Sequence, residues 1–77
     1  MKNKLLTDKE KKYLREIIKP FKDNVECVQK EYLDEHFRLI VIYLKDDKEF
    51  DLQPFNVYDM YCEMEDEKPY TLEELGL

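Results

Sequence analysis

The feature that most constrains this chain is an almost unbroken apolar run from Phe37 to Leu44. Only Arg38 interrupts the run, which is rich in the β-branched and aromatic residues that favour strands. A strand that is apolar on both faces is typical of the middle of a sheet whose two faces are both covered. We therefore expect Phe37–Leu44 to form a central strand that is covered on two sides.

Two further strand patterns flank the central run. Val25–Tyr32 mixes β-branched with polar residues, and Glu49–Gln53 alternates between polar and apolar residues before Pro54 ends it. The polar segment Lys45–Lys48 lies between the central run and Glu49–Gln53, and it is typical of a hairpin turn. The sequence therefore predicts a meander of about three antiparallel strands.

The register of that hairpin stays open at this point. A loop of two or four residues pairs Tyr43 with Phe50, whereas a loop of three or five residues pairs Leu44 with Phe50 and reverses the pairing face. We favour the even loop, because Asp46 and Asp47 tolerate left-handed turn geometry.

A helix is predicted before the first strand. Thr7 and Glu10 have the spacing of a capping box, in which each side chain accepts a hydrogen bond from the other residue's amide. The residues that follow place their apolar side chains on one helical face, namely Tyr13, Leu14, Ile17, Ile18 and Phe21. Pro20 disfavours helical geometry at Lys19, so the helix is expected to end near Ile18 or Lys19.

The C-terminal third carries shorter helical signals. After Pro54, apolar residues recur at helical spacing between Val57 and Met64, which predicts one or two helical turns. Thr71 and Glu74 repeat the capping-box pattern, and Gly76 suits a left-handed helix end. We therefore expect this stretch to fold rather than to form an acidic tail.

We expect residues 1–77 to form a single small α+β domain, with the N-terminal helix packed on the sheet and short helical segments at the C-terminus. The core between helix and sheet is predicted to contain Leu14, Ile17, Ile18, Phe21, Val41, Tyr43, Phe50 and Leu52. The C-terminal segment is predicted to cover the second face of the central strand, which presents Ile40, Ile42 and Leu44.

Charge is distributed unevenly along the chain. Residues 1–45 contain eleven Lys and Arg against eight Asp and Glu (+3), whereas residues 46–77 contain two Lys against eleven Asp and Glu (−9). A net acidic domain disfavours direct nucleic-acid binding, which needs a basic face. No apolar run approaches the roughly 20 residues that span a bilayer, and residues 1–10 lack the apolar stretch of a signal peptide. The expected location is the cytoplasm.

Patterns for catalysis or metal binding are weak. His36 is the single histidine, and no Ser or Cys lies near it in the sequence. Cys27 and Cys62 share no metal-ligand spacing, and the carboxylates around Cys62 favour an unreactive thiol by raising its pKa. No glycine-rich loop is present to hold a phosphate. We therefore expect no catalytic residue, metal site or cofactor, and we expect the protein not to be an enzyme.

Four stretches of the chain resemble a known group of proteins: Tyr13–Phe21, Pro54–Phe55, Met60–Met64 and Tyr70–Leu77. Together they are similar to small uncharacterised proteins from phages and prophages of Gram-positive bacteria, and the resemblance covers most of the chain. It implies no catalytic residue. It does imply an accessory role inside a bacterial host cell, such as binding and inhibiting a component of the host.

We predict that the C-terminal half forms an acidic, tyrosine-containing surface that binds a basic host protein, for example a nucleic-acid-binding or defence protein. Its residues are Tyr58, Asp59, Tyr61, Glu63, Glu65, Asp66 and Glu67. Tyrosine supplies contact area with a polar end, and charge supplies association rate and selectivity. The alternatives are an acidic face that only confers solubility, a self-associating module such as a homodimer with no host target, and a small metal-dependent enzyme.

Overall fold

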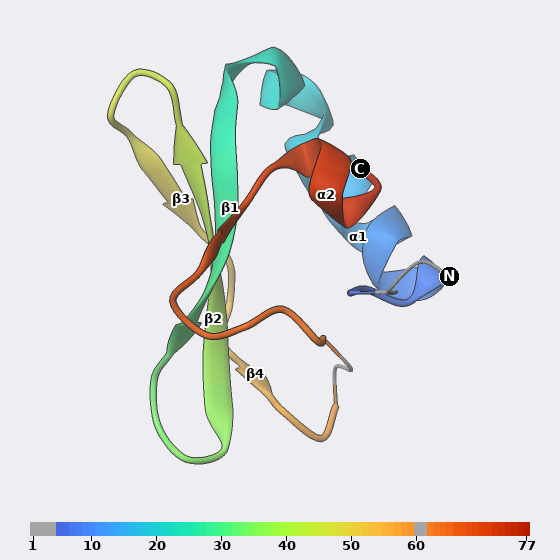
Figure 1. Cartoon of the computed structure of the whole chain (residues 1–77), viewed down its shortest axis with the longest axis vertical. Coiled ribbons are helices and arrows are strands. Elements are labelled where there is room, and N and C mark those ends of the chain that lie inside the picture. Colours follow the sequence, from blue (N-terminus) through green and yellow to red (C-terminus); the bar gives the residue numbers. More distant parts are fainter. Residues whose placement is uncertain (1–4, 60–61) are drawn as a thin grey trace.

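The structure is a computed structural model that describes residues 5–59 and 62–77 (Figure 1). Its elements, in chain order, are α1 (Asp8–Ile18), the 3₁₀ segment η1 (Lys19–Asn24), β1 (Val25–Tyr32), β2 (Phe37–Leu44), β3 (Glu49–Asp51), β4 (Phe55–Asn56), β5 (Pro69–Tyr70) and α2 (Leu72–Leu75). The sheet is antiparallel with strand order β3-β2-β1-β5, and β4 also pairs with β2. The expected α+β architecture and the β1–β2–β3 meander are therefore confirmed.

The N-terminal helix begins and ends where the sequence predicts. The Thr7 amide donates to Oε1 of Glu10 over 3.0 Å, and the Glu10 amide donates to Oγ1 of Thr7 over 3.2 Å, which completes the capping box. Regular α-helix stops at Ile18, and the chain continues through Pro20 as the 3₁₀ segment η1. Pro20 explains this change, because it provides no amide hydrogen for the α-helical pattern.

The β1–β2 hairpin decides which side chains form the core. Val28 lies opposite Ile42, and Lys30 lies opposite Ile40. Because side chains alternate between the two faces of a strand, Val28, Ile40 and Ile42 share one face of the sheet. These three side chains are almost completely buried.

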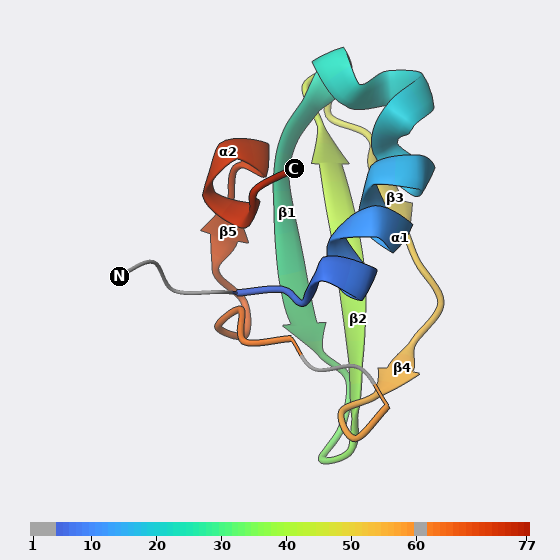
Figure 2. The same ribbon diagram turned by 90° about the vertical axis from the view of Figure 1, so that its right-hand side faces the viewer.

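All of the packed helices lie on that same face. Figure 2 shows α1 and α2 side by side in front of the strands. The core cluster consists of Leu6, Leu14, Ile18, Val25, Val28, Ile40, Ile42, Met64, Tyr70 and Leu75. The C-terminal segment reaches this side through β5, which pairs with the free edge of β1. Tyr70 and Leu75 therefore enlarge the core beneath α1, and the C-terminus is folded as predicted.

The C-terminal segment covers the Ile40 and Ile42 face as predicted, but α1 packs on that face too. The expected core was wrong for Phe50, which is 43% exposed. It was also wrong for Val41 and Tyr43, although Val41 is buried. Both side chains point to the face opposite the helices, and no helix in residues 5–59 or 62–77 covers it. Tyr43 donates its hydroxyl hydrogen bond to Glu31, which also accepts from Nε2 of Gln29 over 3.3 Å. The bond to Glu31 and partial burial raise the pKa of Tyr43. The physical reason for the correction is that α1 and the C-terminal segment both find their apolar partners on the Ile40 and Ile42 face.

The favoured register of the β2–β3 hairpin was also wrong. Tyr43 lies opposite Glu49 and Ile42 lies opposite Phe50, so neither of the two expected partners of Phe50 is correct. Because Ile42 and Leu44 point to the same face of β2, Phe50 still lies on the face that was expected for a loop of three or five residues. Phe50 is partly exposed, and its ring packs edge-on against Phe21 with centroids 5.6 Å apart.

A three-residue turn accounts for this register. The Leu44 amide donates to the Lys48 carbonyl over 2.8 Å, which closes a loop of Lys45, Asp46 and Asp47. Asp47 has a φ of 66°. Three-residue hairpin loops commonly end in such a left-handed residue, and Asp adopts this conformation more readily than most residues.

The helical turns expected between Val57 and Met64 do not form in the part that is described. Phe55 and Asn56 instead form β4, and a turn follows at 57–59. Met60 and Tyr61, on which that expectation partly rested, lie outside the described residues. Strand pairing prevails here because Phe55 and Asn56 can extend the exposed edge of β2.

The closing helix α2 follows its sequence signals. Thr71 and Glu74 form the second capping box, and Gly76 has the left-handed φ of 76° that glycine adopts without strain. Within residues 5–59 and 62–77, no helix has the length and apolar character needed to cross a membrane.

The fold predicts a large stability difference between two neighbouring substitutions on α1. Leu14 is fully buried, so Leu14→Ala should lower the free energy of unfolding by about 2 to 5 kcal/mol. Glu16 is exposed, and Glu16→Ala should change it by less than about 0.5 kcal/mol. Equilibrium urea denaturation of the three proteins measures this difference. Similar midpoints for both variants would contradict the packing of α1 on the sheet.

Candidate protein-binding site

Large apolar side chains gather in solvent at the turn of the β1–β2 hairpin. The exposed fractions are 55% for Tyr32, 47% for Leu33, 40% for Phe37 and 80% for Tyr58. With the exposed His36, these residues form what we call the aromatic tip. Single exposed apolar residues are ordinary on a protein surface, whereas several at one end of a small domain indicate an interaction site. Tyr32 lies opposite Arg38 and therefore points to the face of Ile40, whereas Phe37 points to the other face, so the aromatic tip presents apolar side chains on both sides of the hairpin end.

Hydrogen bonds hold the turn of the aromatic tip in one conformation. Oδ1 of Asp34 accepts from the amides of His36 and Phe37 over 2.8 and 3.0 Å. Nη1 of Arg38 donates to the Asp34 carbonyl over 2.6 Å, and the Leu33 amide donates to the Phe37 carbonyl over 3.3 Å. The turn is therefore fixed by its own side chains rather than by contact with the core.

Tyr58 joins the aromatic tip through β4. Pairing of Asn56 with Phe37 brings the β4 segment beside the turn, and the Val57 amide donates to the His36 carbonyl over 2.9 Å. Oδ1 of Asn56 then accepts from the Tyr58 amide over 2.9 Å. The rings of Tyr58 and His36 lie 6.1 Å apart, so residues from two separate parts of the sequence form one surface.

A cluster of charged residues supports the base of the aromatic tip. Nε of Arg38 contacts Oδ1 of Asp66 over 3.1 Å, and its guanidinium lies 4.5 Å from the centre of the Tyr32 ring. Nζ of Lys30 lies 3.7 Å from Oδ1 of Asp66 and donates to the Cys62 carbonyl over 3.0 Å. The side chains of Lys30 and Arg38 are only 13% and 16% exposed. Asp66 therefore neutralises two cations that are largely removed from water.

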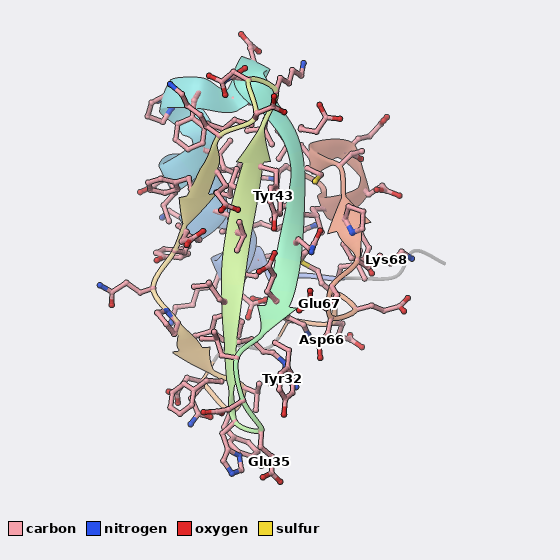
Figure 3. The ribbon with its side chains drawn as sticks, turned by 90° about the vertical axis from the view of Figure 1, so that its left-hand side faces the viewer. Tyr32, Glu35, Tyr43, Asp66, Glu67 and Lys68 are labelled. Carbon is pink, nitrogen blue, oxygen red and sulfur yellow. The ribbon has the colours of Figure 1, made fainter. Side chains whose placement is uncertain are left out.

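The neighbouring carboxylates have structural contacts as well. Oε2 of Glu67 accepts from the Tyr32 amide over 2.8 Å, and the Glu67 amide donates to the Lys30 carbonyl over 2.7 Å. Glu65 pairs with Lys68 over 3.5 Å. Figure 3 shows Asp66 and Glu67 beside Tyr32, near the end of the sheet that carries Glu35. These contacts attach the C-terminal segment to β1.

The structure divides the seven residues of the predicted acidic surface into separate groups. Tyr58 and Asp59 lie at the aromatic tip, whereas Asp66 and Glu67 bind the C-terminal segment to the hairpin. Glu63 is exposed, Glu65 pairs with Lys68 at the surface, and Tyr61 lies outside the described residues.

The sequence did not predict a binding role for the four members of the aromatic tip that come from the hairpin, which are Tyr32, Leu33, His36 and Phe37. One signal could have found them: Tyr32 and Leu33 precede the polar stretch Asp34–His36, and Phe37 follows it. Residues that flank a hairpin turn extend past the core and remain in solvent.

The surroundings of both cysteines favour the protonated thiol. Burial is the main cause of a raised pKa at both Cys27 and Cys62, so each thiol is less ionised than usual at neutral pH. At Cys62, Glu10 and Asp66 raise the pKa further, while a backbone hydrogen bond and Lys30 lower it. Within residues 5–59 and 62–77, no three His, Cys, Asp or Glu side chains come together as metal ligands.

Comparisons with protein-family models, with curated proteins and with solved structures found no match to this chain. Function is therefore argued from the geometry of the molecule.

The charged cluster predicts that one acidic residue matters for stability and its neighbour does not. Asp66→Asn leaves the largely buried charges of Lys30 and Arg38 without a carboxylate, and should lower the free energy of unfolding by about 1 to 2 kcal/mol. Glu63→Gln, which removes the same charge from an exposed position, should change it by less than about 0.5 kcal/mol. Urea denaturation at low salt measures both. Equal stability of the two variants would show that the cluster contributes nothing.

Proposed function

We propose that this chain is a phage-encoded accessory protein that acts in the cytoplasm of a bacterial host, where it binds a host protein with a basic surface. The binding surface is the aromatic tip together with the acidic residues around it. The observation that carries the proposal is the exposure of Tyr32, Leu33, Phe37 and Tyr58 on a turn that internal hydrogen bonds hold in place. The phage context comes from the resemblance of the sequence.

The residue types at the aromatic tip suit a protein partner. Aromatic side chains at the centre of an interface contribute much of the binding energy, because they bury a large area at a small cost in conformational entropy. The tip offers such side chains from two separate segments. Its fixed turn reduces the ordering that binding would otherwise require.

Charge around the aromatic tip favours a basic partner. Residues 32–37 and 55–59 contain Asp34, Glu35 and Asp59 but no Lys or Arg. Arg38 is the first cation that follows the turn in the sequence, and it already forms an ion pair with Asp66. An exposed acidic rim around apolar side chains accelerates association with a basic surface and weakens as salt is added.

The structure changes which carboxylates a binding experiment should remove. Asp66 and Glu67 stabilise the fold, so replacing them would confuse binding with stability. Glu35 and Asp59 are exposed at the tip and are suitable for substitution. Glu16 and Glu73 are exposed on the two helices and provide a matched control with the same change in charge.

The test is a comparative capture of proteins from host lysate. We expect a host protein that binds the wild type, is lost with Tyr58→Ala, and is retained by Tyr13→Ala, which removes a half-exposed tyrosine from α1. With this protein purified, Glu35→Gln combined with Asp59→Asn should slow association about threefold to tenfold at low salt, because steering depends on these charges. Glu16→Gln combined with Glu73→Gln should leave the rate unchanged.

Two results would overturn the proposal. The first is that every captured protein is retained equally by Tyr58→Ala and by the wild type. The second is an association rate that responds to neither salt nor the tip carboxylates.

A further inference from the structure

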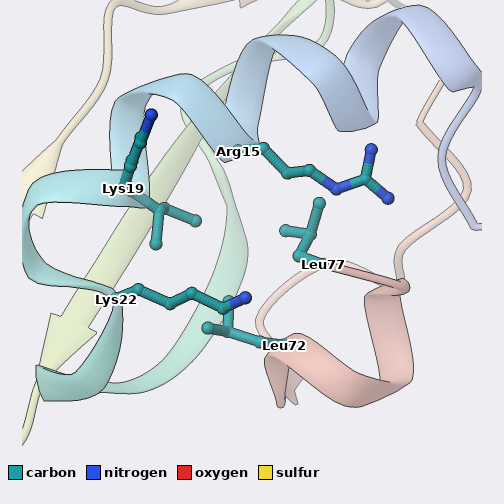
Figure 4. A pocket seen from close by; sticks show the side chains of 6 residues that line it. Arg15, Lys19, Lys22, Leu72 and Leu77 are labelled. Atoms are coloured by element: carbon teal, nitrogen blue, oxygen red, sulfur yellow. The ribbon is translucent and has the colours of Figure 1, made fainter.

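A pocket lies at the end of the molecule opposite the aromatic tip. It is bordered by α1, η1 and the C-terminal residues, whereas the hairpin turn lies at the far end of the long strands (Figures 1 and 4). Its lining residues are Arg15, Ile18, Lys19, Lys22, Leu72 and Leu77, which we call the cationic pocket.

The lining of the cationic pocket combines apolar surface with positive charge. Ile18, Leu72 and Leu77 supply the apolar part, and all three remaining lining residues are cations. Nη2 of Arg15 donates to the Gly76 carbonyl over 2.9 Å, which holds the end of α2 against α1. Lys19 and Lys22 are exposed, and within the described part of the chain neither side chain forms a hydrogen bond or an ion pair. The pocket therefore suits an apolar group that carries negative charge beside it.

The size of the pocket limits what can enter. Its volume is about 190 Å³. A cavity of about 150 Å³ accommodates a benzene molecule, so this pocket has room for one large apolar side chain rather than for an extended ligand. The complementary group is thus a single Leu- or Phe-sized side chain with carboxylates next to it.

The chain itself presents such a group at its other end. Leu33 is 47% exposed and is followed directly by Asp34 and Glu35. We propose that the cationic pocket receives Leu33 from the aromatic tip of a second copy of this chain, with Glu35 beside Lys19 and Lys22. The molecule then associates head to tail through two different surfaces.

Head-to-tail contacts have a defined consequence for assembly. Because the two surfaces differ and lie at opposite ends, each added copy leaves one tip and one pocket unoccupied, and the assembly grows as an open chain. The interface is small, so the association should be weak and sensitive to salt. The inference uses the same aromatic tip as the proposed function but requires no host partner, and a host protein would compete with self-association.

Two variants separate the surfaces. Lys19→Glu with Lys22→Glu reverses charge at the pocket and leaves the tip intact. Leu33→Ser with Glu35→Gln alters the tip and leaves the pocket intact. Lys9→Glu with Lys12→Glu is the matched control, because it reverses two exposed charges elsewhere on α1. Circular dichroism confirms that each variant is folded before it is used.

The measurement is sedimentation velocity of the purified proteins at low salt over a range of concentrations. The average mass of the wild type and of the control variant should rise with concentration, and should return to the monomer value at about 0.5 M salt. The pocket variant and the tip variant should each remain monomeric alone. Mixed in equal amounts, they should form a dimer that grows no further, because the mixture contains one functional tip and one functional pocket per pair.

Several results would overturn this inference. A wild type that stays monomeric up to millimolar concentration would exclude self-association. Association that survives in the pocket variant would place the contact elsewhere, and a mixture that remains monomeric would exclude pairing of tip and pocket. The proposed function survives each of these outcomes, because capture of a host protein depends on the tip and not on the pocket.

Discussion

Alternation of side chains along β2 is the constraint on which the rest of the structure depends. The β1–β2 register places Val28, Ile40 and Ile42 on one face, and these residues form the apolar floor of the molecule. Helices as short as α1 and α2 are not stable alone in water, so their apolar faces need this floor. Within residues 5–59 and 62–77, the helices cover one face of the sheet, and the other face has cross-strand contacts such as that between Tyr43 and Glu31.

One-sided packing also separates the chemistry of the two ends. Near the C-terminus, α2 packs against α1 and brings apolar residues beside Arg15, Lys19 and Lys22. At the other end, the hairpin extends beyond the core, so Tyr32, Leu33 and Phe37 remain 40% to 55% exposed. The fold thus places an apolar surface beside Arg15, Lys19 and Lys22 at one end, and an apolar surface beside Asp34, Glu35 and Asp59 at the other.

Local signals in the sequence predicted local structure well. Both capping boxes, the end of α1 before Pro20, and the left-handed Gly76 depend on side chains within a few residues of one another. The patterns Val25–Tyr32 and Phe37–Leu44 form β1 and β2 with these bounds, whereas Glu49–Gln53 forms only the shorter β3 (Glu49–Asp51). Each of these features is decided by interactions that the sequence shows directly.

Choices between nearly equal alternatives could not be read from the sequence. Phe37–Leu44 is apolar on both faces, so its periodicity does not tell which face receives α1. The β2–β3 register depends on a left-handed Asp47, a conformation that its residue type permits but does not require. From the sequence, Asp66 and Glu67 were assigned to an interaction surface. In the structure they contact Lys30, Arg38 and Tyr32, which lie about 30 positions away in the sequence. Such long-range contacts appear only after the chain has folded.

The central claim is that the aromatic tip is an exposed surface held in a fixed conformation. Backbone ¹⁵N relaxation of the free protein measures this directly at Leu33, His36 and Phe37. If the hydrogen bonds of Asp34 and Arg38 hold the turn, its order parameters should be about 0.85, as in rigid backbone. Values below about 0.6 at these positions, together with rigid values in β1 and β2, would show a flexible turn and contradict the account.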